Sequence, residues 1–139
     1  MSIQDAQLTD LLTNVHSIAA VGVTNHAASS GYEVLSYQQS QGYDVTPVNP
    51  QESSILGMPC AKSVNDIQDP VDLVNVFSET ADLDEVVEDA ANKNAKALWL
   101  QPGVANETAE KRAHKAGMTV VKDKCFRQVH QTLMAHKPF

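Results

Sequence analysis

Positive charges, cysteines and aromatic residues are all scarce in this chain of 139 residues, which has 10 Lys and Arg against 17 Asp and Glu. The formal net charge of −7 repels nucleic acids and anionic membranes, and no block of basic residues reverses that repulsion locally. Two cysteines are too few for a disulfide scaffold, so a reducing compartment is expected. Nucleic-acid-binding and membrane-surface proteins are therefore disfavoured.

Long hydrophobic runs are also missing, since no apolar segment approaches the ~18 residues of a transmembrane helix. The chain does not open with a basic stretch followed by an apolar one, so no secretory leader is expected. With 42% hydrophobic residues, a chain of this length can bury a core of its own. We therefore expect a single domain, residues 1–139, in the cytoplasm.

Short apolar segments alternate with segments of helical periodicity. Leu83, Val86, Val87 and Ala90, for example, have the spacing of one helix face, and Asn106 is a suitable N-cap for a helix that ends before Gly117. The expected strands are residues 17–22, 44–49, 71–77, 95–100 and 118–121. The expected helices are residues 4–14, 32–41, about 83–90, 106–115 and 124–135, with 25–31 and 51–63 as loops.

Strands that alternate with helices of about ten residues favour parallel pairing through right-handed crossovers. The expected fold is therefore an α/β, three-layer sandwich around a five-stranded parallel sheet in the order 3-2-1-4-5. Such sheets bind ligands at the carboxyl ends of the strands, where the strand order reverses. We expect the reversal between the first and fourth strands, with a crevice lined by residues 22–31, 49–50, 77–78 and 101–103.

The segment after the first expected strand has the arrangement of an anion site. Gly22, Val23 and Thr24 lie between a strand and a helix, where unpaired backbone N–H groups meet the positive end of the helix dipole. This predicts a phosphate or pyrophosphate ligand. Alternatively, Gly22 could be needed only for a tight turn where the chain leaves the strand. The dinucleotide pattern G-x-G-x-x-G is incomplete, since only its first glycine is present and Asn49 replaces the expected acidic residue.

Five motifs in order resemble a known family: VGVT at 21–24, PVNP at 47–50, VDLVNVF at 71–77, WLQPG at 99–103 and the segment 123–130. They are similar to the small bacterial CoA-binding proteins, relatives of the CoA-binding domain of the succinyl-CoA synthetase alpha subunit. The resemblance covers about residues 18–133. It implies a Rossmann-like fold and coenzyme A as the ligand, but not ligase activity, because 139 residues leave no room for the second domain of the synthetase.

The resemblance also implies roles for individual residues. Gly22, Val23 and Thr24 would line the CoA pyrophosphate and ribose, and Asn49 and Pro50 would border the adenosine pocket. The opposite wall, near the pantetheine, would come from Phe77, Gln101, Pro102 and Gly103.

The chain departs from the family at three positions that are often basic. They are occupied by Ser29, Gln51 and Ser78, although Ser29, Ser30 and the loop amides up to Gly31 could still donate neutral hydrogen bonds. A lost charge-assisted hydrogen bond costs ~1.5–3 kcal/mol when it is well desolvated. We therefore expect CoA binding to be weak.

Two classes of function fit these residues. The first is a non-catalytic module that binds CoA or acyl-CoA, such as a sensor or a partner of an acyl-CoA enzyme. The second is a small enzyme that uses NAD(P) or ATP, or the thiol of Cys125 at a helix N-terminus. His130 lies five residues after Cys125, which is not the same helix face, and no His/Cys spacing matches a zinc site. The first class is favoured, with no catalytic residue and no metal.

Overall fold

The computed structural model describes residues 5–24, 30–77, 83–104 and 106–134. Its main sheet has five parallel strands, in accordance with the expected Rossmann-like α/β fold. These strands are β1 (Ser17–Val21), β2 (Asp44–Val48), β5 (Leu73–Val76), β6 (Ala97–Leu100) and β7 (Thr119–Lys122). The helices are α1 (Asp5–Asn14), α2 (Ser30–Ser40), α3 (Leu83–Asn92), α4 (Glu107–Lys115) and α5 (Phe126–Leu133).

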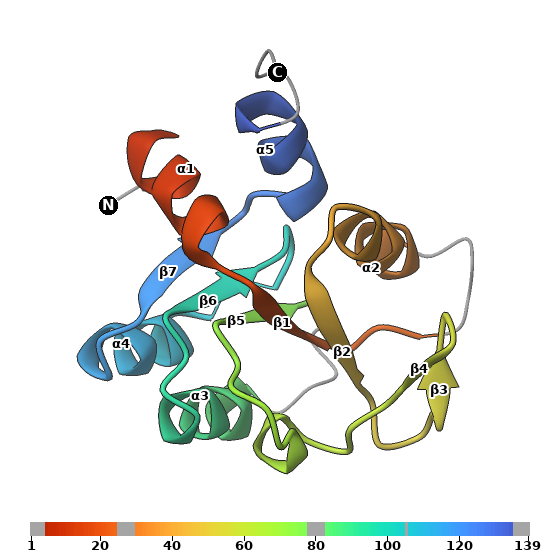
Figure 1. The fold of residues 1–139 in the computed structure, drawn as a ribbon. Coiled ribbons are helices and arrows are strands. Elements are labelled where there is room, and N and C mark those ends of the chain that lie inside the picture. Colours follow the sequence, from red (N-terminus) through yellow and green to blue (C-terminus); the bar gives the residue numbers. More distant parts are fainter. Residues whose placement is uncertain (1–4, 25–29, 78–82, 105, 135–139) are drawn as a thin grey trace.

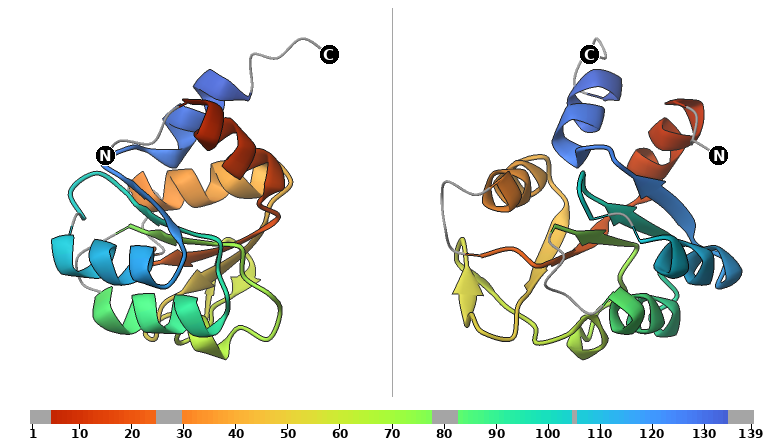
Figure 2. Two further views of the ribbon diagram at one scale, coloured as in Figure 1. Left: turned by 90° about the vertical axis from the view of Figure 1, so that its left-hand side faces the viewer. Right: turned by 180° about the vertical axis from the view of Figure 1, so that it is seen from behind.

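The helices form a layer on each side of the sheet. Helices α1, α2 and α5 cover one face, while α3 and α4 cover the other (Figures 1 and 2). Asn106 caps α4 as predicted, since its Oδ1 accepts a hydrogen bond from the Ala109 N–H at 3.1 Å. The segment 51–63, expected to be a loop, contains the antiparallel pair β3 (Ser54–Ile55) and β4 (Met58–Pro59), and a short 3-10 helix, η1 (Val64–Asp66), follows it.

The order of the strands in the sheet differs from the expected one. It is β2-β1-β5-β6-β7, so the third main strand, β5, lies between the first and the fourth instead of outside the second. Ile18 of β1 is paired with Val45 on one side and with Leu73 on the other. The order 3-2-1-4-5 was wrong because it places β2 inside the sheet, where Pro47 has no N–H for a second ladder. The reversal of strand order therefore lies between β1 and β5.

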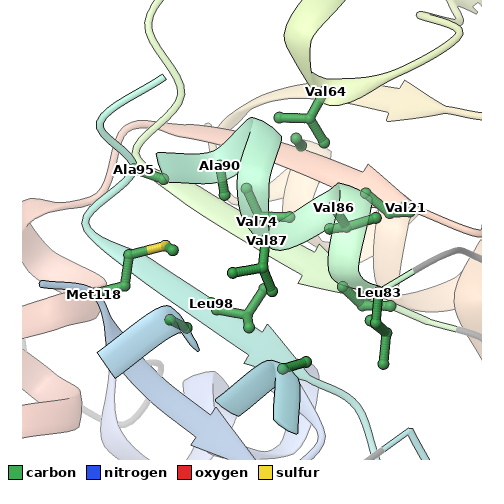
Figure 3. Packing of buried hydrophobic residues seen from close by; sticks show 14 of the residues in the cluster. Val21, Val64, Val74, Leu83, Val86, Val87, Ala90, Ala95, Leu98 and Met118 are labelled. Carbon is green, nitrogen blue, oxygen red and sulfur yellow. The ribbon is translucent and has the colours of Figure 1, made fainter. Parts of the chain in front are cut away.

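The hydrophobic core has one part on each face of the sheet. Under α3 and α4, Val86 and Val87 pack near Val74 and Leu98 (Figure 3). Under the other three helices, Trp99 lies against Phe126, with ring centroids 5.1 Å apart. Trp99 is fully buried, and its indole Nε1 donates to the Lys124 carbonyl at 2.7 Å.

Asp72 joins the amino ends of β1 and β5. Its Oδ2 accepts hydrogen bonds from the backbone N–H groups of His16 at 2.9 Å and Ser17 at 3.3 Å, and Lys96 Nζ lies 3.9 Å from its Oδ1. Burial raises the pKa of Asp72, but these two amides and the charges of Lys96 and His16 outweigh it, so the pKa is lowered overall. The ionised carboxylate therefore stabilises the start of the central strands.

We expect Asp72→Asn to lower the free energy of unfolding by about 1–2 kcal/mol near pH 7. Because the folded pKa lies below the ordinary value of ~3.9, the contribution is present above that pH and is lost as the pH falls through the folded pKa. In urea unfolding, the difference in free energy of unfolding between the wild type and Asp72→Asn should be smaller near pH 3 than near pH 7. Asp44→Asn, at an exposed position, is the control, and an equal Asp72→Asn loss at both pH values would contradict this role.

Candidate functional site

A cleft of about 440 Å³ lies at the carboxyl ends of β1 and β2, on the α3 side of the sheet. The ends of these strands and the segments after them form one wall of the cleft. The opposite wall comes from η1 and α3, and residues 62–63 connect the outer edge of β2 to η1. The residues that line the cleft are Val21, Gly22, Thr24, Val48, Asn49, Pro50, Gln51, Lys62, Ser63, Val64, Glu85, Val86 and Asp89.

Gly22 sets the direction in which the chain leaves β1. Its φ is 89°, a left-handed conformation that costs a residue with a Cβ roughly 1–2 kcal/mol. Its N–H donates to the Val48 carbonyl at 3.3 Å, which ties the turn to β2. After this turn Thr24 lines the cleft, whereas Val23 is buried in the core on the α2 side. Only two of the three residues expected at the pyrophosphate therefore have surface in the cleft.

Asn49 connects the segment after β1 to the turn after β2. Its side-chain Nδ2 donates to the Val23 carbonyl at 2.9 Å, and its Oδ1 accepts from the Gln51 N–H at 2.8 Å. Both ends of the amide are thus engaged within the protein. Asn49 borders the cleft, as does Pro50, but the amide holds two loops together and fixes the shape of the cleft floor.

The residues expected on the opposite wall do not line this cleft. Phe77 donates its N–H to the Val21 carbonyl at 2.8 Å, and its ring packs on the α2 side. A Cβ on Gly31 would lie 3.4 Å from that ring, so the absence of a side chain at Gly31 lets α2 approach Phe77 closely.

Gln101 has a structural partner in α5. It is buried, and its Oε1 accepts a hydrogen bond from the Phe126 N–H at 3.0 Å. It thereby caps α5, whose own N-cap residue, Cys125, makes no side-chain cap bond. Pro102 and Gly103 are exposed in the turn that follows β6. Ser29 and Ser78 lie outside the described residues, and Ser30 begins α2.

The thiol alternative gains no support from the surroundings of Cys125 and His130. Cys125 is half-buried at the start of α5. His130 is buried, its Nδ1 lies 2.6 Å from the Tyr37 hydroxyl, and its ring contacts Tyr43 and Phe126. Burial lowers the pKa of His130, so the ring is neutral at physiological pH. His130 is engaged in an aromatic cluster between α2 and α5.

The sequence did not predict that certain charged residues lie in the cleft. Lys62 went unnoticed because residues 51–63 were expected to be irregular, with no strand to place them. Glu85 and Asp89 lie on the acidic side of α3, and their i, i+4 spacing brings both to the cleft. Among the described residues, no group of three or more His, Cys, Asp or Glu is placed to hold a metal ion. Over the same ranges, none of the helices has the length and apolarity to cross a membrane.

We expect Asn49→Ala to lower the free energy of unfolding by about 1–3 kcal/mol, because the Val23 carbonyl and the Gln51 N–H lose their partner. Asn49→Asp should cost more than Asn49→Ala, since a carboxylate would face the Val23 carbonyl oxygen without a proton to donate. Denaturant unfolding of the three proteins near pH 7 measures both effects. An Asn49→Asp variant as stable as the wild type would contradict the bridging role.

Comparison with known proteins places the chain in a family. A family model described as a CoA binding domain matches residues 16–131. The uncharacterized protein YneT of Bacillus subtilis (strain 168) is 32% identical over 125 residues, which cover 90% of this chain and 93% of that protein. A hypothetical protein from Pyrococcus horikoshii OT3 has a similar solved structure, with a TM-score of 0.92, 35% identity, and coverage of 95% of this chain and 93% of that one.

A larger protein shares the same region. The alpha subunit of the ADP-forming acetate–CoA ligase II of Pyrococcus furiosus is 30% identical over 129 residues, covering 85% of this chain but 28% of the ligase subunit. The similarity thus concerns one part of the ligase. Since the family model spans most of the sequence, and the fold and the ordered motifs agree with it, the chain belongs to the family of CoA binding domains.

Proposed function

We propose that this domain binds coenzyme A, or an acyl-CoA, in the cleft beside β1 and β2, and that it catalyses no reaction of its own. The observation that carries the proposal is the turn at Gly22, which leads from a central parallel strand into a cleft at the carboxyl edge of the sheet. Open α/β sheets bind nucleotides at the carboxyl ends of their strands. Membership of the CoA binding domain family supports CoA as the nucleotide.

Different residues of the cleft lining would contact different parts of such a ligand. The pyrophosphate belongs at Gly22 and Thr24, where the missing Cβ of Gly22 lets a phosphate approach the backbone. The adenosine belongs against Pro50, Val64 and Val86, which supply apolar surface. The pantetheine then runs along the sheet edge toward Phe77 and Gln101.

The residue types in the cleft support a binding role. Its described lining includes Lys62, Glu85 and Asp89 but no histidine or cysteine. Cys125 lies at the start of α5, on the other face of the sheet. The domain would then act in the cytoplasm as a CoA or acyl-CoA sensor, or as the partner of an acyl-CoA enzyme.

A thermal-shift panel with CoA, acetyl-CoA, NAD, NADP and ATP tests the proposal. A ligand at 100 times its dissociation constant stabilises a protein by ~2.7 kcal/mol. We expect CoA and acetyl-CoA to raise the melting temperature more than the other three compounds do. Stabilisation by NAD or ATP alone would favour the nucleotide-dependent enzyme instead.

Gly22→Ala should weaken CoA binding at least about tenfold, because the added Cβ blocks close approach of a phosphate to the backbone. Gly117→Ala is the matched control. Gly117 has a φ of 88°, nearly that of Gly22, but it lies at the end of α4, outside the cleft lining. Both variants should lose similar stability from backbone strain. Equal CoA affinity of the two variants, by calorimetric titration, would remove the site from this turn.

A further inference from the structure

Lys62 is held beside the turn that follows β2. The preceding residue, Ala61, forms a parallel bridge with Val48. The Ala61 N–H donates to the Pro47 carbonyl at 2.9 Å, and the Ala61 carbonyl accepts from the Asn49 N–H at 2.9 Å. This short piece of chain extends the sheet at the outer edge of β2. It fixes the backbone of Lys62 at the level of Asn49 and Pro50.

In the neighbouring turn, residues 49–52, the hydrogen-bond donors of Asn49 Nδ2 and of the Gln51 and Glu52 amides are already engaged within the protein. The Gln51 N–H donates to Asn49 Oδ1 at 2.8 Å, and the Glu52 N–H points to the Asn49 carbonyl at 3.4 Å. The Asn49 Nδ2 is engaged with Val23. An anionic group on this side of the cleft must therefore find its donor outside this turn.

Lys62, beside this turn, can provide that donor together with a positive charge. It is exposed, and it is the only Lys or Arg among the described residues that line the cleft. It forms no ion pair with any other described residue. An ammonium group on a flexible four-carbon stem is a common phosphate partner.

The remaining charges of the cleft restrict where an anion can lie. Glu85 and Asp89 are on α3, on the other wall. Their carboxylates repel a phosphate, which favours a position near Lys62. The cleft therefore has one cationic end, which lies on its β2 side.

We propose that Lys62 binds the 3′-phosphate of the CoA ribose and so makes the cleft selective for CoA over nucleotides that lack this group. The inference rests on the proposed function, in which the pyrophosphate lies at Gly22 and the adenosine lies against Pro50. With the pyrophosphate at the end of β1, the phosphate on the ribose is the one that reaches the β2 side. Lys62 thus replaces the cation that the turn itself lacks at Gln51.

Calorimetric titration of CoA and of dephospho-CoA into the wild type, Lys62→Met and Lys111→Met tests this assignment. Lys111 is a matched control because it is an exposed lysine on α4, paired with Glu107 outside the cleft. We expect the wild type and Lys111→Met to bind CoA at least about tenfold more tightly than dephospho-CoA, as a charge-assisted hydrogen bond implies. In Lys62→Met the two affinities should become nearly equal, with that for dephospho-CoA unchanged within about twofold.

The outcomes separate this inference from the proposed function. If the wild type binds both ligands and Lys62→Met keeps the wild-type ratio of affinities, the assignment of Lys62 is wrong and the cleft remains a CoA site. A wild type that does not prefer CoA over dephospho-CoA also overturns the assignment. If the wild type binds neither ligand, the proposed function fails and this inference fails with it. Unfolding curves of the three proteins show whether each variant is folded.

Discussion

The exit of β1 is held by strands on both of its sides, and the shape of the cleft depends on this arrangement. The Gly22 N–H donates to the Val48 carbonyl of β2, and the Val21 carbonyl accepts from the Phe77 N–H that follows β5. Asn49 adds a side-chain bond to the Val23 carbonyl. With the strand fixed in this way, the left-handed turn at Gly22 leads the chain away from the sheet. The carboxyl ends of β1 and β2 therefore remain accessible in the cleft.

The amino end of β1 contributes to stability, and its carboxyl end borders the proposed ligand site. At the amino end, Asp72 satisfies the backbone donors of His16 and Ser17 with a half-buried carboxylate, which favours stability. At the carboxyl end, the Gly22 N–H, the Val23 carbonyl and the Asn49 side chain have partners within the protein. A ligand therefore meets a preformed surface, and little ordering of the strand ends is needed when it binds.

The sequence predicts the kind of each main element better than it predicts their arrangement. Apolar periodicity is local, so strands and helices appear near their expected positions. The strand order is not local, and only Pro47 indicated that β2 belongs at an edge. Gly22, Thr24, Asn49 and Pro50 were predicted at the site and do border the cleft. Gln101 caps α5 instead, and Lys62 was missed because its placement depends on a bridge between distant residues.

The nucleotide part of CoA is proposed to lie on the α3 side of the sheet edge. Changes in backbone amide NMR chemical shifts, recorded as unlabelled CoA is added to isotope-labelled protein, test this placement. The largest changes are expected at residues 22–24, 49–52 and 61–64, with smaller ones at the amino end of α3. Shifts concentrated instead between α2 and α5, around Tyr37 and Arg127, or no shifts at saturating CoA, would contradict it.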